Sequence, residues 1–156
     1  MTLKEHLLAT FDETWDHRWE SFALVMKDVD SEMARYQHPA YYSDADTEYN
    51  AKNGSLVWHI AHLAHCHLQY ADVITGRPEV PAEPPFPNVD SLEASLEQIT
   101  LSRAKLRSAI ESVSEDQLSD KVCGGDTVAA YIQTILRHDA WHFGQMAVVK
   151  RLYKST

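Results

Sequence analysis

The sequence predicts an all-α protein folded as a four-helix bundle, and three observations lead to that fold class. Apolar side chains recur at spacings of three and four in four long segments, which is the period of an amphipathic helix. The five glycines and six prolines gather between those segments. No stretch shows the strict alternation of a half-buried strand. Four helices of roughly 20 to 35 residues fill the chain, and packing them side by side buries their apolar faces.

The first helix is expected over about residues 2 to 36. Its apolar stripe is Leu3, Leu7, Phe11, Trp15, Trp19, Phe22, Val25, Met26 and Val29. The second helix is expected to begin after "NAKNGS", where Asn53 or Ser55 can cap the free amides, and to stop at Gly76. Its predicted buried side is Leu56, Ile60, Leu63, Tyr70 and Ile74.

The third helix is expected over about residues 89 to 113, followed by a single turn in which Ser114 and Gln117 have the capping-box spacing. The fourth begins after "GGD", with Asp126 or Thr127 as the cap, and places basic residues near its negative end. The Pro-rich connection between the second and third helices, residues 76–88, is longer than a tight helical hairpin needs. We expect it to cross the end of the bundle near the site that the helices build.

Length and composition predict one domain over residues 1–156, because 156 residues with 44% hydrophobic content suffice for one sizeable core. With 23 acidic and 14 basic residues the formal charge is −9, which argues against nucleic-acid and anionic membrane partners. No segment approaches the roughly 20 apolar residues of a membrane span, so a cytoplasmic protein is expected. Cys66 and Cys123 are interpreted as reduced thiols, although spacing alone leaves a disulfide between them open.

The segment "RHDAWHFGQ", residues 137–145, places two histidines in the apolar pattern of the fourth helix. His138 and His142 are four residues apart, so on a helix they share one face and can close on a single metal ion. A buried imidazole without a partner loses about 1–3 kcal/mol of hydrogen bonding to water. A metal ion would satisfy both rings, whereas the alternative is that each ring hydrogen-bonds to a neighbouring side chain or carbonyl.

The second helix adds four of the nine histidines: His59, His62, His65 and His67. A helical wheel places His67 deepest, His59 on one shoulder of the buried face, His62 further round that shoulder and His65 toward solvent. Geometry therefore slightly favours His59 or His67 as a third ligand and selects neither.

"LVWHIAHL" at residues 56–63, followed by "HDAWHFGQ" at residues 138–145, resembles the metal-binding signature of the DinB/YfiT-like superfamily of four-helix bundles. The resemblance covers the order and number of helices and the length of the chain, and its residue-level match rests on these two segments. It implies a metal site formed by His62, His138 and His142. It also implies that His59 lines the pocket or supports the metal ligands from behind.

Gly144 and Gln145, the other residues of the signature, each have a physical explanation. Gly144 removes a side chain where a neighbouring helix or a ligand can approach closely, at a cost of up to about 1 kcal/mol relative to alanine. Gln145 lies on the histidine face and can hydrogen-bond a ligand, a metal-bound water or the next helix. A polar lock between helices without chemistry is the alternative for Gln145.

Three histidines leave open positions on a metal ion, which is the arrangement of a catalytic site. The resemblance implies an enzyme that uses a divalent metal, with zinc or nickel expected and iron an alternative. We expect a transferase that uses a low-molecular-weight thiol such as bacillithiol, mycothiol or glutathione and acts on a small-molecule substrate. The alternatives are a hydrolase that uses a metal-bound water and a non-catalytic metal-binding stress-response protein.

Two further expectations concern the rest of the molecule. No catalytic acid or base can be assigned, and Asp139 and Glu13 are the candidates by position alone. A dimer is expected to be a two-fold symmetric homodimer, which is the commonest form.

Overall fold

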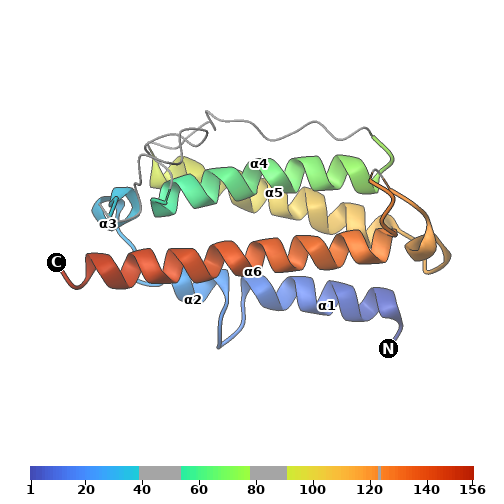
Figure 1. Cartoon of the computed structure of the whole chain (residues 1–156), viewed down its shortest axis with the longest axis horizontal. Helices are drawn as coiled ribbons and strands as arrows, with labels where there is room; N and C mark the ends of the chain where they lie inside the picture. Colours follow the sequence, from blue (N-terminus) through green and yellow to red (C-terminus); the bar gives the residue numbers. More distant parts are fainter. Residues whose placement is uncertain (39–53, 78–90, 123) are drawn as a thin grey trace.

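The computed structural model describes residues 1–38, 54–77, 91–122 and 124–156. Its four long helices are α1 (Leu3–Trp15), α4 (Leu56–Ile74), α5 (Leu92–Ser112) and α6 (Val128–Tyr153). Three short helices accompany them: α2 (Phe22–Met26), α3 (Ser31–Arg35) and the 3-10 turn η2 (Asp116–Ser119). The predicted all-α bundle is confirmed (Figure 1). Cys123 and most of the Pro-rich connection lie outside the described residues.

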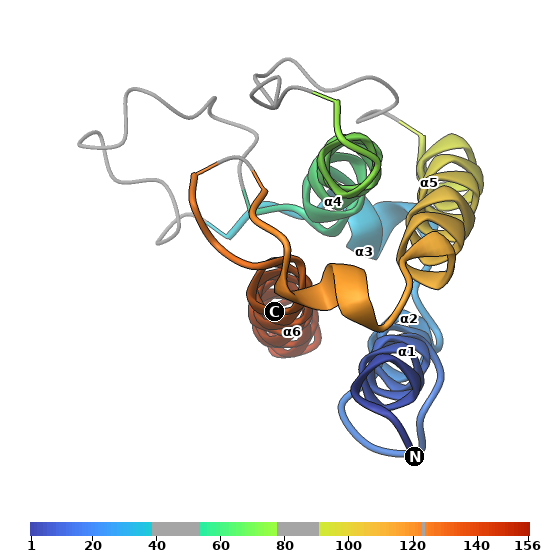
Figure 2. The same cartoon turned by 90° about the vertical axis from the view of Figure 1, so that its right-hand side faces the viewer.

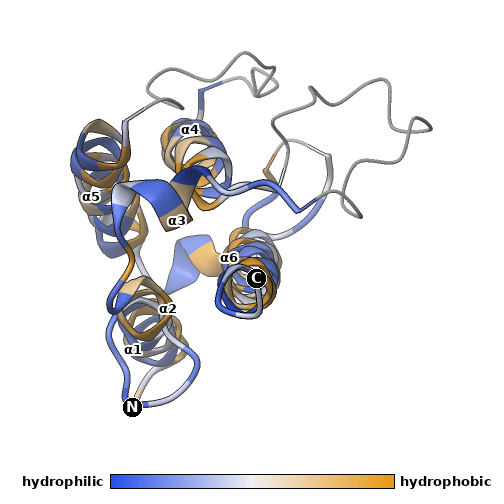
Figure 3. Cartoon of the chain, turned by 90° about the vertical axis from the view of Figure 1, so that its left-hand side faces the viewer, coloured by the Kyte–Doolittle hydropathy of each residue, from blue (hydrophilic) through white to orange (hydrophobic). Residues whose placement is uncertain are grey.

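The long helices lie side by side in the bundle (Figure 2), and their buried apolar side chains form two clusters. α4 packs along α5, while α1 and then α2 follow one side of α6. Colouring by hydropathy shows apolar stripes on the sides of the helices that face one another (Figure 3). No helix in the described part of the chain is both long and apolar enough to cross a membrane.

The single helix expected over residues 2 to 36 is wrong, because the chain turns twice within it. α1 ends at Trp15, and the next helix starts afresh with the Ser21 side chain accepting from the Leu24 amide. A second restart follows at Asp30, whose carboxylate caps α3. Glu20, directly before the Ser21 cap, and Asp28, two residues before the Asp30 cap, have φ angles of 53° and 60°, which an α-helix does not accommodate. The apolar period was real, but the capping residues inside it break the helix.

Local capping chemistry fixes the other helix boundaries. Ser55 caps α4, and Thr127 rather than Asp126 caps α6. The predicted capping box is confirmed by reciprocal hydrogen bonds between Ser114 and Gln117. α4 ends at Ile74 with Thr75 as its C-cap, and Gly76, the next residue, has a φ of 82°. There the amides of residues 76 and 77 bond to the carbonyls of residues 73 and 72, as in a Schellman motif.

A buried polar network crosses the middle of the bundle. Asp139 of α6 bonds through Oδ1 to Nε2 of His67 on α4 at 2.9 Å, and its Oδ2 lies 3.5 Å from Nη1 of Arg103 on α5. Arg103 also donates to the Phe11 carbonyl and to Thr14 Oγ1 on α1, and its guanidinium lies 3.8 Å above the centre of the Phe11 ring. All four long helices therefore meet at one set of charges, of which Asp139 and His67 are fully buried.

Replacing Asp139 with alanine is expected to lower the free energy of unfolding by about 3–5 kcal/mol, because the Arg103 guanidinium would stay buried without its counter-charge. Urea unfolding followed by circular dichroism measures the change. Asp12→Ala is the matched control, since Asp12 also pairs with an arginine of α5 but is exposed, and it should cost no more than about 1 kcal/mol. Equal effects of the two substitutions would contradict the importance of the buried network.

Candidate metal centre

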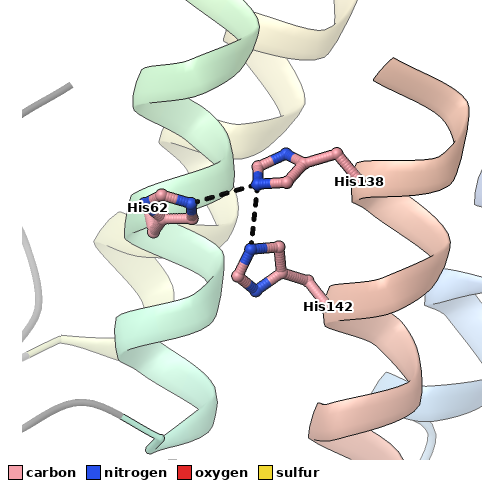
Figure 4. A group of neighbouring side chains, drawn as sticks. All are labelled: His62, His138 and His142. Carbon is pink, nitrogen blue, oxygen red and sulfur yellow. Dashed lines mark hydrogen bonds between the residues drawn. The ribbon is translucent and has the colours of Figure 1, made fainter. Parts of the chain in front are cut away.

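Three histidine side chains converge between α4 and α6 (Figure 4). His62 projects from α4, and His138 and His142 project from successive turns of α6. Nε2 of His138 lies 3.4 Å from Nε2 of His62 and 3.1 Å from Nε2 of His142. The three rings offer one ligand atom each, all within 4.8 Å of one another. The structure thus brings together the three residues that the resemblance implied.

Regular helix geometry accounts for this convergence. His138 and His142 are separated by one turn, and their face of α6 also carries the buried Tyr131, Ile135 and Val149. That face turns toward α4, where the Ser55 cap sets the start of the helix and His62 lies two turns further on. The predicted histidine face of α6 is confirmed.

The protonation of the three rings suits metal binding. Burial lowers the pKa of His62 to about 4, with the neighbouring His138 adding to the effect. Burial also lowers the pKa of His142 to about 2, and that of His138 below its ordinary value. The rings are therefore neutral at pH 7. Each neutral ring has one lone pair, so three facing nitrogens suit a shared cation better than mutual hydrogen bonds.

Two further side chains hold the outer nitrogens of the α6 histidines. Tyr70 Oη lies 3.1 Å from Nδ1 of His138, and Nδ1 of His59 lies 2.8 Å from Nδ1 of His142. With the Nε2 lone pairs directed at a metal ion, both Nδ1 atoms carry protons and donate to these partners. Tyr70 and His59 would then fix the tautomer and the orientation of the two rings.

From the sequence, a supporting role for His59 follows only from the family resemblance. Tyr70 is expected only to lie on the buried side of its helix. Tyr70 is eight residues after His62, so the two share a face of α4. That spacing was the available signal. The partner of Tyr70 is on α6, however, and only the packing of the two helices identifies it.

His62 also contacts Trp58 and Cys66, two residues of its own helix. The Trp58 ring stacks on the His62 ring with centroids 5.1 Å apart and an angle of 4° between planes. Cys66 Sγ lies 3.5 Å from Nε2 of His62. Burial raises the pKa of Cys66 to about 12, so this side chain is a thiol at neutral pH.

The helical wheel placed His67 and His59 deeper than the other two histidines of α4, as the structure confirms, but burial does not identify the histidine that joins the cluster. His67 is fully buried and His59 nearly so, whereas His62 and His65 are half-buried. His67 pairs with Asp139 instead of facing the cluster. The half-buried shoulder position of His62 is the one that meets α6.

The remaining predicted residues have different outcomes. Asp139 is engaged by His67 and Arg103, and Glu13 is exposed on α1, so neither candidate acid or base is free beside the cluster. No neighbouring helix in the described part of the chain approaches Gly144 closely, because a Cβ there would have nothing within 4 Å, and the approach of a ligand stays a prediction. Gln145 is half-buried on α6, and its contact with a ligand stays a prediction.

Comparison with known proteins yields one match. The family model described as the DinB superfamily matches residues 14–146, which include all three clustered histidines and Gln145. No curated protein and no solved structure matches the chain.

Substitution of His62, His138 or His142 by alanine is expected to abolish stoichiometric metal binding, because each removes a ligand. His59→Ala and Tyr70→Phe should retain a metal ion with about 10–100-fold weaker affinity, since they disturb only the orientation of the rings. Elemental analysis of protein purified without a polyhistidine tag, followed by titration of the metal, measures both effects. A metal-free wild type that cannot be reloaded, or a complete loss in His59→Ala alone, would contradict this assignment.

The metal-free protein is expected to lose stability as the pH falls below 6.5. Burial lowers the pKa of His59 to about 3 and that of His142 to about 2, so the unfolded state binds more protons than the folded state below pH 6.5. Between pH 6.5 and the folded-state pKa, each ring lowers the free energy of unfolding by up to about 1.4 kcal/mol per pH unit of acidification. Above pH 6.5 both rings are neutral in the folded and unfolded states, and this loss is absent. Urea midpoints from pH 7.5 to 5 in the presence of a chelator measure the slope. His59→Leu should flatten it and the exposed His6→Gln should not, whereas an unchanged slope in His59→Leu would contradict the prediction.

Proposed function

The chain belongs to the DinB superfamily, and from this premise we propose that it is a metal-dependent transferase that joins a low-molecular-weight thiol to a small electrophilic substrate. The observation that carries the proposal is the convergence of three neutral Nε2 atoms from α4 and α6. Three protein ligands leave at least one position for an exogenous ligand, as catalytic sites do.

The donor set fits a borderline divalent ion. Imidazole nitrogens suit zinc, nickel and ferrous iron, and we propose zinc or nickel as the physiological metal. Bound there, the ion would act as a Lewis acid that lowers the pKa of a coordinated thiol or water.

The protein's own side chains have distinct parts in this proposal. His62, His138 and His142 would hold the ion, while Tyr70 and His59 would accept hydrogen bonds from the outer N–H groups of His138 and His142 and keep those rings in place. Cys66 is held as a protonated thiol by its burial, so the reacting sulfur would come from the cosubstrate and not from the protein.

The choice of a thiol over water rests on proton transfer. A free thiol has a pKa of about 8.5, so a modest shift suffices to ionise it at neutral pH. Water needs a much larger shift or a nearby base. The carboxylate adjacent to His138, that of Asp139, is already bonded to His67 and cannot serve as that base without breaking the network. Metal-assisted hydrolysis and metal binding without catalysis are the competing functions.

A thiol-dependence assay tests the proposal. Protein loaded with zinc or nickel is incubated with bacillithiol, mycothiol or glutathione and a panel of small electrophiles such as epoxides and alkyl halides, and loss of free thiol and formation of the thioether are followed by mass spectrometry. We expect turnover that requires both the metal and one thiol, with a loss of at least about 100-fold in His138→Ala. Thiol-independent hydrolysis by the loaded protein would instead favour the hydrolase. Stable metal binding without any turnover would favour the binding protein.

A further inference from the structure

A stripe of small and apolar residues, exposed except for the half-buried Ala147, runs along α6 on the side opposite the histidines. The stripe comprises Ala140, Gly144, Ala147 and Val148, and the charged Arg151 lies at its C-terminal end. At 100° per residue, its members lie on average about half a turn away from His142. Together with Glu20, Val25 and Phe143 they line a surface groove of about 420 Å³. Val148 is 42% exposed, and Leu24 on the adjoining α2 is 45% exposed.

Gly144 at the centre of this stripe is not required by the fold of the chain. A Cβ at this position would have nothing within 4 Å, and the residue has ordinary helical backbone in the interior of α6. Glycine costs such a position up to about 1 kcal/mol relative to alanine. The space above Gly144 lets another backbone approach α6 closely.

The groove carries opposite charges at its two ends. Phe22 at the start of α2 packs against Phe143, with ring centroids 5.4 Å apart. Further along, Lys150 Nζ bonds to the Val25 carbonyl at 2.8 Å, so α2 and α6 run in the same direction. Glu20 therefore lies toward the Ala140 end of the stripe, and Arg151 lies at the other end, roughly 16 Å away along the helix. Neither residue forms a salt bridge within the part of the chain that the structure describes.

From this charge arrangement we infer that the groove binds a second copy of the same chain. A two-fold axis perpendicular to α6 near Gly144 would set the two α6 helices antiparallel. It would place Glu20 of each copy against Arg151 of the other. A surface with one acidic end and one basic end complements itself under this symmetry, and the apolar middle supplies the buried contact.

The inferred interface is separate from the metal centre. Its residues project from the opposite side of α6, so changes there leave His138 and His142 in place. Metal content therefore reports on the centre and molecular mass reports on the interface. The two proposals can fail independently.

Sedimentation velocity of the full-length protein over a range of concentrations, with light scattering as a second measure of mass, tests the inference. The wild type should be a dimer. Gly144→Arg should be a folded monomer. The arginine side chain fits on the surface of a single copy, but it would clash with the second copy in the dimer. Val148→Asp should act in the same way. Leu101→Asp is the matched control, since Leu101 is an exposed apolar residue of α5 outside the groove and should leave the dimer intact.

A charge exchange tests the symmetry. Glu20→Arg and Arg151→Glu should each raise the dimer dissociation constant about tenfold or more, because each places like charges together. The double variant should recover most of the affinity. Circular dichroism and metal content should match the wild type in every variant. A monomeric wild type, a dimer that survives both Gly144→Arg and Val148→Asp, or a double variant no better than the single ones would overturn the inference.

Discussion

The buried carboxylate of Asp139 is the interaction on which the arrangement of this bundle depends. Its two oxygens face His67 from α4 and Arg103 from α5, and Arg103 reaches on to the backbone of α1. A charge at this depth tolerates little displacement, because each lost contact leaves a desolvated group without compensation. The network therefore fixes the rotation of α6 about its axis. His138, the residue immediately before Asp139, is thereby turned toward α4.

The two faces of α6 explain how one helix can serve two purposes. The inner face presents neutral imidazoles whose outer nitrogens are held by Tyr70 and His59. Desolvation disfavours protonation of these rings, so the protein keeps lone pairs available where a cation can use them. The outer face is small, apolar and flanked by opposite charges, which suits contact with another protein surface. Because the side chains of the two faces diverge, each face can be altered without the other.

The first 38 residues show how local chemistry can override a periodic pattern. Apolar spacing there continues across Ser21 and up to Val29, but Ser21 and Asp30 cap new helices, and Glu20 and Asp28 take left-handed conformations. The expected stripe therefore loses Trp19, which is 64% exposed, while Phe22 and Val25 rejoin the core from α2. The capping residues were visible in the sequence. Whether they end the helix depends on tertiary packing that stabilises the broken form. The Trp15 ring stacks on the Phe22 ring across the turn and supplies such a contact.

The sequence by itself determined the helical class, the end of α4 beside Gly76 and the common face of His138 and His142, because caps and helical periodicity act over a few residues. It narrowed the N-caps of α4 and α6 to two candidates each, and the structure selects Ser55 and Thr127. The sequence also placed His67 and His59 deeper than His62 and His65, as the structure has them. The choice of His62 required the relative placement of α4 and α6, since His62 lies 76 residues before His138, the nearer of its two partners in the chain. Tertiary packing also pairs Asp139 with His67 instead of with the three clustered histidines, and it leaves Gly144 exposed on the surface. These outcomes depend on contacts between helices, which no periodicity within one helix encodes.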